Sequence, residues 1–333
     1  MKDVNVIVYG VGSVGSGIVN TLRSRKGVKL VGAVDVDPEK IGKDVGVVAG
    51  GEPIGVIVTD DARKLVQTVK ADVALNTAAP LGIRETYQDM LWAIENGVNV
   101  IVASMETCNL WFTDAELAKE VDAVCKQHGV TYMGIGATQV EERYITCMTE
   151  GCTDVQHISF THHADCQAFT DESNAAEWGL TLTKEEFTRR VAEGTVKSKE
   201  ELKSIVPYVA NTFGWELDDV KMVKELQTDA NGRINSIKAT VEGFIGGVSK
   251  IDMNWEMVIE PERRYFDHLV VKGTPMIDAM NNYTPDRGMA ATIGSITNCI
   301  ACIAKLPTGY VNTLTAPACH IIYDEYGKHI LSF

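Results

Sequence analysis

The sequence lacks a long apolar run and a compact cysteine framework. Its first apolar stretch, Val4 to Tyr9, is interrupted by Asn5 and ends at a glycine. Such a stretch is too short for the core of a signal peptide and far too short to cross a bilayer. Eight cysteines are scattered through 333 residues, as is typical of reduced thiols in a reducing compartment. We therefore expect a cytoplasmic protein without disulfides and without membrane association.

The sequence also lacks any block of basic residues. Against 45 acidic residues it has 31 Lys and Arg, which gives a formal net charge of −14. This charge opposes binding to a phosphate backbone or to an anionic membrane, so nucleic acid is not expected as a partner. It mildly favours a cationic small molecule such as an amine. The hydrophobic content of 45% is that of an ordinary globular protein, and the length predicts two domains.

The first part of the chain has the pattern of an α/β domain. From residue 4 to about 135, short Val- and Ile-rich runs alternate with amphipathic stretches, which predicts βαβ units on a parallel sheet covered on both faces. A capping box at Thr113-Asp-Ala-Glu116 predicts a helix that begins after Thr113. The predicted strands are 4–9, 30–35, 55–59, 73–76, 98–103 and 130–134.

The second part has longer alternating strands, predicted at 155–163, 234–245, 250–259 and 265–272. They indicate a largely antiparallel sheet. Capping boxes at Thr183–Glu186 and Ser198–Glu201 predict helices between them, which makes this domain α+β. The small, apolar stretch from Gly288 to Lys305 is predicted to be a helix that packs back on the first domain.

These patterns predict two domains that meet in a cleft. The dinucleotide-binding (Rossmann) domain comprises residues 1–136 and 286–333, and residues 137–285 form an α+β domain for substrate binding and dimerisation. Exposed edges of an antiparallel sheet are a common dimer surface, so we expect a homodimer.

A glycine-rich turn follows the first predicted strand and opens a helix. In this context the pattern GxGxxG predicts a dinucleotide site: the first glycine permits the tight turn, the second lets the pyrophosphate approach, and the third lets helix and strand pack closely. A glycine-rich turn without a ligand is the alternative. The turn consists of Gly10, Val11, Gly12, Ser13, Val14 and Gly15.

The other cofactor residues are expected where later strands end. Asp35 ends the second strand, where a carboxylate accepts hydrogen bonds from ribose hydroxyls and repels a 2′-phosphate. We therefore predict NAD as the cofactor, with NADP as the alternative because Lys40 is nearby. Ligands of doubly wound sheets lie beyond the carboxyl ends of the strands, which places Thr77, Ala78 and Thr138 beside the nicotinamide end.

Three residues are candidates for acid–base chemistry. Glu106 follows the fifth strand near the expected nicotinamide position, where partial burial would make it a useful general base. A capping or ion-paired glutamate is the alternative. His162 and His163 are neighbours on one strand, so they must point to opposite faces, and at most one of them enters the pocket. Neither is expected to hold a metal.

Two further patterns favour structural roles. The pair Cys299-Ile-Ala-Cys302 lies in a small, apolar helical stretch, with no second pair to complete a zinc site. Core packing explains it best. Asp252, Asn254 and Glu256 alternate with apolar residues, which predicts one polar face on that strand, either solvated or lining the substrate site.

These residues together resemble the 2,4-diaminopentanoate dehydrogenase and native amine dehydrogenase family, whose N-terminal domain is related to dihydrodipicolinate reductase. The resemblance runs nearly from end to end. It implies that Glu106 activates the water that attacks an iminium after hydride has left the amine carbon. The matching stretches include VIVYGVGSVGSGI, VGAVDVDPEKIGKDVG, ADVALNTAA and GVNVIVASMET.

The chain departs from this family at two places. It has Thr138-Gln139-Val140-Glu141 where the family has Asn-Pro-Gly-Phe, and Thr284–Arg287 where the family has Pro-Gly-Gly. Both places lie at the expected cleft, so the resemblance leaves the particular substrate open.

The sequence therefore predicts NAD-dependent oxidative deamination of a small primary amine or diamino acid to the ketone, reversible as reductive amination. One alternative is a dehydrogenase of a small hydroxy compound, or an imine reductase, with His162 or His163 as the proton-transferring residue. Another is a non-catalytic NAD-binding module.

Overall fold

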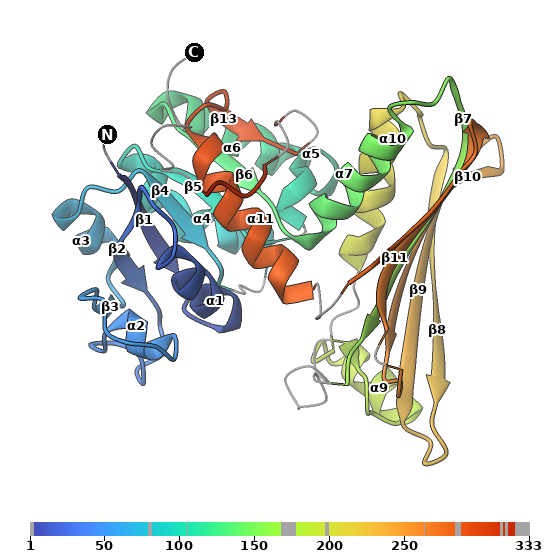
Figure 1. Cartoon of the computed structure of the whole chain (residues 1–333), viewed down its shortest axis with the longest axis horizontal. Helices are drawn as coiled ribbons and strands as arrows, with labels where there is room; N and C mark the ends of the chain where they lie inside the picture. Colours follow the sequence, from blue (N-terminus) through green and yellow to red (C-terminus); the bar gives the residue numbers. More distant parts are fainter. Residues whose placement is uncertain are drawn as a thin grey trace. The chain divides into compact units, whose positions relative to one another are not determined.

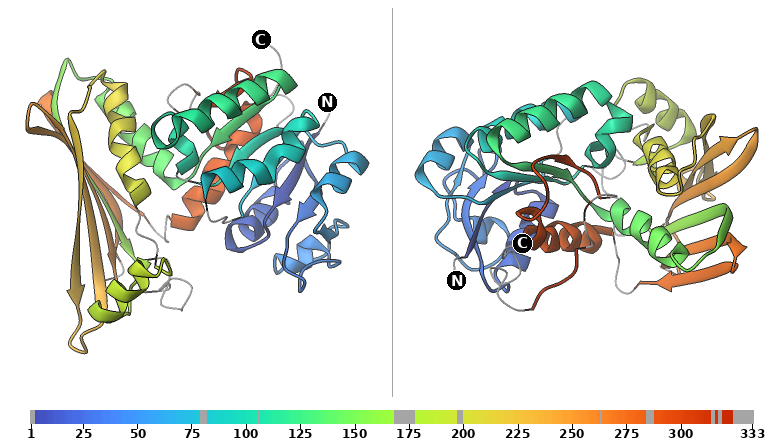
Figure 2. Two further views of the ribbon diagram at one scale, coloured as in Figure 1. Left: turned by 180° about the vertical axis from the view of Figure 1, so that it is seen from behind. Right: turned by 90° about the horizontal axis from the view of Figure 1, so that it is seen from above.

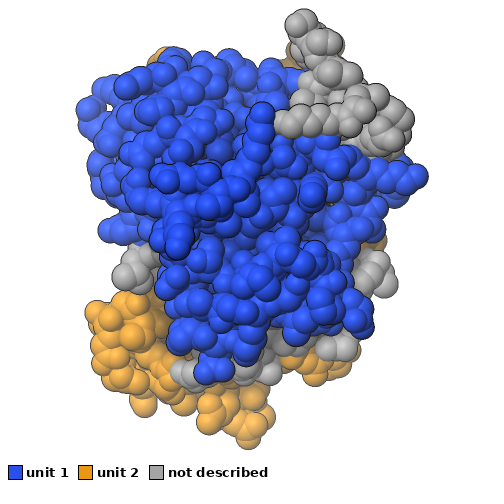
Figure 3. Space-filling view, turned by 90° about the vertical axis from the view of Figure 1, so that its left-hand side faces the viewer, with its two compact units in different colours: residues 1–140, 289–333 blue, residues 141–288 orange. Residues whose placement is uncertain are grey.

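The computed structural model describes residues 3–78, 82–104, 106–167, 178–196, 200–262, 264–283, 288–313, 316 and 319–323. In the helix that spans residues 137–149, the side chains of residues 137–140 lie outside this description. The chain divides into two compact units (Figure 3), one of residues 1–140 with 289–333 and one of residues 141–288. The predicted α/β fold class is confirmed: one unit contains a parallel sheet and the other a largely antiparallel one.

The first unit is built on a seven-stranded sheet whose neighbouring strands all pair in parallel. Its order is β13-β6-β5-β4-β1-β2-β3, which is the order of a Rossmann fold with one added edge strand. Sequence patterns predicted every strand except the short β13. The strands are β1 Val4–Tyr9, β2 Val28–Val34, β3 Val58–Thr59, β4 Val73–Asn76, β5 Asn99–Val102, β6 Thr131–Gly134 and β13 Gly309–Val311.

Helices cover both faces of this sheet (Figure 2). On β1, Val6 and Val8 pack with residues of α1 and α11, whereas Ile7 packs with residues of α4 and α6. Strands buried on both faces explain the nearly continuous apolar runs in the sequence. The helices are α1 Ser13–Leu22, α2 Val45–Val48, α3 Ala62–Thr68, α4 Ile83–Glu95, η1 Glu106–Asn109, α5 Leu110–Thr113, α6 Ala115–His128 and α11 Gly288–Ile303.

Helix α11 confirms the prediction that the chain returns to the first unit. Ile296, Cys299 and Ile300 are buried in the same core as the residues of β1 and α1. A Cβ at Gly17 of α1 would collide with Cδ1 of Ile293 in α11, so the isoleucine side chain would have to shift where the two helices approach.

The start of α6 corrects one prediction. Asp114, not Thr113, is its N-cap, and the Asp114 carboxylate accepts a hydrogen bond from the Leu117 N–H at 3.0 Å. Thr113 already belongs to the last turn of α5, so its backbone does not have the extended conformation of an N-cap. Its hydroxyl donates instead to the carbonyl oxygens of Glu106, at 3.0 Å, and Asn109, at 3.2 Å.

The second unit is built on a six-stranded sheet of order β12-β11-β7-β10-β9-β8. Only β7 and β10 pair in parallel. The sequence did not predict β8 and β12, because both are edge strands in which no residue is buried. The strands are β7 Asp154–Asp165, β8 Asp219–Thr228, β9 Ile234–Ile245, β10 Val248–Val258, β11 Tyr265–Thr274 and β12 Ile277–Asn282.

The helices of the second unit are α9 Lys184–Ala192, η2 Glu200–Ser204 and α10 Ile205–Thr212, and α7 Ala137–Thr149 spans the boundary between the units (Figure 1). The predicted cap of α9 is confirmed: the Thr183 hydroxyl accepts from the Glu186 N–H at 3.2 Å. The other predicted cap, Ser198, lies outside the described residues. Within the described ranges, every helix is too short or too polar to span a bilayer.

The cap of α9 gives a testable prediction. Thr183→Ala removes the oxygen that accepts from Glu186 and should lower the free energy of unfolding of this region by about 1 kcal/mol. Urea unfolding, with hydrogen exchange at the Glu186 amide, measures the change. Thr183→Ser keeps the hydroxyl and is the matched control. Equal losses in both variants would show that the threonine methyl, and not the cap, stabilises the helix.

Candidate functional site

The glycine turn after β1 has a different constraint at each glycine. Gly10 has φ +90°, and a Cβ there would lie 2.5 Å from the backbone nitrogen of Ala78. A Cβ at Gly15 would collide with the carbonyl oxygen of Gly10. At Gly12, by contrast, a Cβ would meet nothing within 4 Å. The first and third glycines therefore allow close packing, and the second leaves open space against the backbone.

That open space adjoins the first turn of α1. Gly12 is the N-cap and offers no side chain to the N–H groups of the turn, and no acidic residue lies in that turn. The first intrahelical hydrogen bond at this end runs from the Ser16 N–H to the Gly12 carbonyl oxygen at 2.8 Å. Ser13 is exposed, whereas Val14 is packed partly against the core. A helix start of this kind has the donors and the dipole direction to bind an anion.

Asp35 closes the turn from the side of β2. One of its carboxylate oxygens accepts from the Val11 N–H at 2.7 Å and from the Lys40 ammonium at 3.0 Å, and the other accepts from the Asp37 N–H at 2.9 Å. Burial raises the pKa of Asp35, but the hydrogen bonds from the backbone N–H groups and from Lys40 lower it by more, so the pKa lies below its usual value. Asp35 is therefore an anion held by the loop itself.

Thr77 ties the end of β4 to the same turn. Its backbone N–H donates to the Tyr9 carbonyl oxygen at 2.8 Å, and its hydroxyl donates to the Gly10 carbonyl oxygen at 2.5 Å. The Ala78 N–H donates to the Asn76 side-chain oxygen at 3.0 Å. The amide nitrogen of Asn76 is buried and has no hydrogen-bond partner among the described residues. A ligand acceptor at this edge of the sheet would satisfy it.

Glu106 is the first residue of η1, directly beyond β5. The Ser104 hydroxyl donates to Glu106 Oε2 at 2.7 Å, and the Thr113 hydroxyl donates to the Glu106 carbonyl oxygen at 3.0 Å. Thr107 is completely buried, and its hydroxyl donates back to the Ser104 carbonyl oxygen at 2.8 Å. The glutamate therefore stands on a loop that is fixed on both sides of it, with its side chain half-buried.

Tyr310 of β13, near the C-terminal end of the chain, holds this loop in place by two hydrogen bonds. Its phenol accepts from the Leu110 N–H at 2.9 Å and donates to the Thr107 carbonyl oxygen at 2.8 Å. A side chain at Gly134, the last residue of β6, would collide with the Thr107 carbonyl. One phenol and one missing side chain therefore set the position of the loop that carries Glu106.

The candidates of the first unit share one edge of the parallel sheet. They follow β1, β2, β4 and β5, and parallel strands bring their carboxyl ends to a common edge. A cavity of about 830 Å³, lined by Val4, Val73 and Asn99 among others, opens at the amino ends of the same strands. It therefore lies at the wrong edge to bind the dinucleotide. The side chain of Thr138 and residues 284–287 lie outside the described residues.

His162 and His163 lie in the second unit and, as expected, have separate sets of partners. His162 Nδ1 lies 2.7 Å from Asp267 Oδ1, and the Tyr283 hydroxyl donates to Asp267 Oδ2 at 2.9 Å. Glu141 of α7 lies 3.7 Å from the same imidazole nitrogen and is 2% exposed. This is an imidazole oriented by a buried carboxylate, with hydroxyl and carboxylate groups around it.

His163 is held between two carboxylates. Its Nδ1 lies 3.0 Å from Glu256 Oε2 and its Nε2 lies 3.0 Å from Glu260 Oε1, while the ring stacks on Phe266. Burial lowers the pKa of His163, but the hydrogen bonds to Glu256 and Glu260 raise it above its usual value. Arg264 and His163 together lower the pKa of Glu260 to about 2 against the effect of burial. These groups form a structural ion network.

No sequence pattern pointed to Tyr310, Asp267 or Tyr283. Tyr310 lies 200 residues from Leu110, its backbone partner. Asp267 and Tyr283 lie 105 and 121 residues from His162, on and just beyond other strands of the sheet. No local spacing connects such residues, because only the order of the strands brings them together.

The fold and the glycine turn define a protein with a Rossmann domain. Residues 140–331 match the family described as the 2,4-diaminopentanoate dehydrogenase C-terminal domain, and residues 4–106 match the dihydrodipicolinate reductase N-terminus. The first match covers more than half of the chain. The protein therefore belongs to the 2,4-diaminopentanoate dehydrogenase family.

Similarity to individual proteins extends over most of the chain. A 2,4-diaminopentanoate dehydrogenase of Acetoanaerobium sticklandii is 24% identical over 92% of this chain and 90% of its own. The structure of an amine dehydrogenase from Mycobacterium smegmatis has a TM-score of 0.82 at 22% identity, covering 97% of this chain and 98% of that one. A scyllo-inositol dehydrogenase from Lactobacillus casei, with bound NAD(H) and scyllo-inositol, shares the fold with a TM-score of 0.51 at 14% identity, covering 85% of this chain and 77% of that one.

The Tyr310 phenol gives the prediction for this site. Tyr310→Phe leaves the Leu110 N–H without its acceptor and should lower the free energy of unfolding by about 1–3 kcal/mol. Turnover should fall as well, because the loop that carries Glu106 is less firmly held. Urea unfolding and steady-state kinetics measure the two effects. Tyr323→Phe, at an 82% exposed tyrosine, is the control. If Tyr310→Phe behaves like this control, the phenol does not set the loop.

Proposed function

We propose that this chain catalyses NAD-dependent oxidative deamination of a small primary amine or diamino acid, and the reverse reductive amination of the ketone. The placement of Glu106 carries the proposal. This carboxylate is fixed beyond β5, at the same sheet edge as the glycine turn and Asp35. The relatives from Acetoanaerobium sticklandii and Mycobacterium smegmatis are named for dehydrogenation of amines, which supports the reaction class.

The residues of the turn fit a dinucleotide. The open space at Gly12 and the uncapped start of α1 suit the pyrophosphate. The Asp35 carboxylate has about four acceptor sites, of which Val11, Asp37 and Lys40 use three, so a ribose hydroxyl can be accepted as well. The Asn76 amide nitrogen, buried without a partner among the described residues, suits an acceptor at the nicotinamide end. Bound NAD supplies the hydride acceptor.

Glu106 performs the proton chemistry in this proposal. The amine carbon loses its hydrogen with both electrons to the cofactor, which leaves an iminium. The Glu106 carboxylate takes a proton from water as the water oxygen attacks the iminium carbon, and returns that proton to the nitrogen as the carbon–nitrogen bond breaks. The hydroxyl proton of the carbinolamine passes to the departing ammonia, so a neutral amine, NAD⁺ and water give the ketone, ammonium and NADH. Ser104 donates to Glu106 Oε2, so Oε1 is the oxygen that takes the proton from water in this proposal.

One observation favours a second candidate, dehydrogenation of a small hydroxy compound. His162 is oriented by buried Asp267, which Tyr283 orients in turn, and such a pair is suited to taking a proton from a hydroxyl. His163 is less suited, since both of its ring nitrogens face carboxylates. Ammonia dependence distinguishes the two reactions.

The test of the proposed reaction is NADH formation or consumption with small amines, diamino acids, alcohols and the matching ketones, with and without ammonium. Glu106→Gln should lower kcat by about 10²–10⁴, the usual contribution of one general base. NAD binding by tryptophan fluorescence should stay unchanged, which shows that the variant is folded. His162→Asn, assayed in parallel, should retain most of the turnover of amines.

The opposite pattern would overturn this assignment. Ammonia-independent oxidation of an alcohol that survives Glu106→Gln and is lost in His162→Asn would establish the hydroxy-compound reaction. Binding of NAD without turnover of any compound in the panel would favour a non-catalytic module.

The choice of NAD over NADP depends on Asp35. Asp35→Asn removes the negative charge that accepts ribose hydroxyls and repels a 2′-phosphate, so kcat/KM for NAD should fall about 10- to 100-fold while that for NADP rises. Asp37→Asn is the matched control, because Asp37 is only partly buried, its carboxylate lies 3.5 Å from the Lys40 ammonium, and asparagine keeps the oxygen that accepts from the Glu39 N–H at 2.9 Å. A parallel fall for both cofactors would mean that Asp35 only holds the Val11 backbone.

A further inference from the structure

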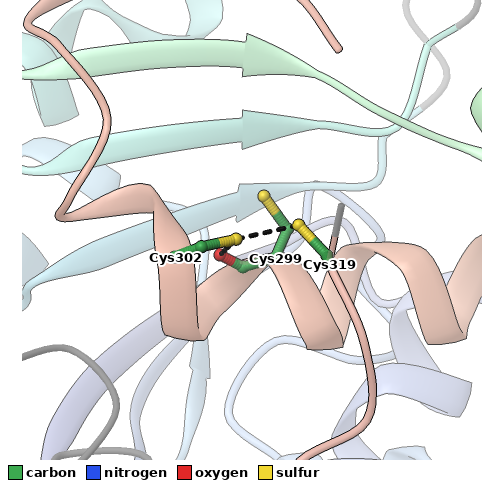
Figure 4. A group of neighbouring side chains, drawn as sticks. All are labelled: Cys299, Cys302 and Cys319. Atoms are coloured by element: carbon green, nitrogen blue, oxygen red, sulfur yellow. Dashed lines mark hydrogen bonds between the residues drawn. The ribbon is translucent and has the colours of Figure 1, made fainter. Parts of the chain in front are cut away.

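Three cysteine sulfurs meet beside α11 in the first unit (Figure 4). Cys299 and Cys302 lie one turn apart on this helix, and Cys319 belongs to the segment of residues 319–323. All three Sγ atoms lie within 4.8 Å of one another, and those of Cys302 and Cys319 are 2.8 Å apart. The sequence predicted core packing for the first two. That holds for fully buried Cys299, but Cys302 is half-buried and faces a third sulfur that the sequence did not reveal.

We propose that Cys299, Cys302 and Cys319 form a binding site for one thiophilic cation of the Zn²⁺ type. Tetrahedral coordination with Zn–S bonds of about 2.3 Å places thiolate sulfurs roughly 3.8 Å apart. All three Sγ atoms lie within 4.8 Å of one another, and the Cys302 and Cys319 sulfurs, at 2.8 Å, have to move apart by side-chain rotation to admit the ion. An all-sulfur set selects soft cations over Mg²⁺ or Ca²⁺. Water completes the coordination on the side where Cys302 and Cys319 are partly exposed.

Binding of a metal ion at this site releases the protons of the cysteine thiols. Hydrogen bonds with Cys302 and Cys319, together with burial, raise the pKa of Cys299 well above its usual value. Cysteines bind a metal as thiolates, so each of the three thiols gives up its proton on binding. Three thiols and Zn²⁺ give a zinc trithiolate and three protons, with no change of oxidation state. Affinity should consequently increase with pH.

The position of the cluster indicates a structural role. Ile322, three residues beyond Cys319, accepts a hydrogen bond at its carbonyl oxygen from Arg25 Nη1 at 3.4 Å, and the Arg25 guanidinium lies 6.0 Å from the ring centroid of Tyr323. A cation held by the three sulfurs would join this segment to α11, which packs against α1 at Gly17. It would therefore stabilise the unit that carries the glycine turn and take no part in hydride transfer.

The test uses the full chain, purified with reductant and chelator and then freed of both. Titration with Zn²⁺ alone should show one equivalent bound, and Co²⁺ should give the sulfur-to-metal charge-transfer absorption of thiolate coordination. Cys302→Ser and Cys319→Ser should each weaken Zn²⁺ binding by at least about 10- to 100-fold, a range that loss of a mere outer-shell partner already reaches. Cys147→Ser, at an exposed cysteine outside the cluster, is the matched control and should bind like wild type.

Thermal unfolding provides the second readout. Zn²⁺ should raise the Tm of wild type and of Cys147→Ser, but not that of the two cluster variants. The spectrum of wild type with Co²⁺ needs no variant, so it decides the matter even if a serine variant fails to fold. A Co²⁺ spectrum without thiolate bands, or one equivalent of Zn²⁺ bound equally by Cys302→Ser, would overturn the proposal. So would oxidation of Cys302 and Cys319 to a disulfide that one equivalent of Zn²⁺ does not slow.

Discussion

The contact between the turn after β1 and the end of β4 is the constraint on which the site depends. Gly10 lies so close to Ala78 that any side chain would collide with its backbone, and Thr77 bonds to the Gly10 carbonyl oxygen at 2.5 Å. This contact leaves Gly12 beside open space at the start of α1. Asp35 then fixes the turn from the other side through the Val11 N–H. A single backbone conformation therefore presents the helix start, the carboxylate and the end of β4 at one edge of the sheet.

Elements whose structure is determined by their own local sequence could be predicted from that sequence. Strands buried on both faces, such as β1, have nearly continuous apolar residues, and two glycines of the turn, Gly10 and Gly15, each meet a local steric demand. Prediction was weaker for elements whose structure depends on neighbouring elements. β8 and β12 are exposed edge strands that are held by hydrogen bonds to their partner strands. The N-cap of α6 is Asp114 and not Thr113, because Thr113 belongs to α5.

The neighbouring histidines show the same limit within the candidate site. Strand alternation alone requires His162 and His163 to face opposite sides of the sheet, as they do. Their chemical environments, however, come from β10, β11 and the residues that follow those strands. Asp267 orients His162, whereas Glu256 and Glu260 hold His163 between two negative charges. The sequence identified the two histidines as candidates, but it could not show that they have different hydrogen-bond partners.

Because Tyr310 lies near the C-terminal end of the chain, the loop that carries Glu106 is completed late in the synthesis of the protein. The ribosome delivers the glycine turn, Asp35 and Glu106 within the first third of the chain, but the residue that fastens the Glu106 loop arrives 200 residues after Leu110. Folding during synthesis proceeds from the N-terminus, so the nascent first unit lacks both its last edge strand and α11, whose residues share the core of β1 and α1. The loop that carries Glu106 therefore takes its final position only after the last part of the chain has been synthesised.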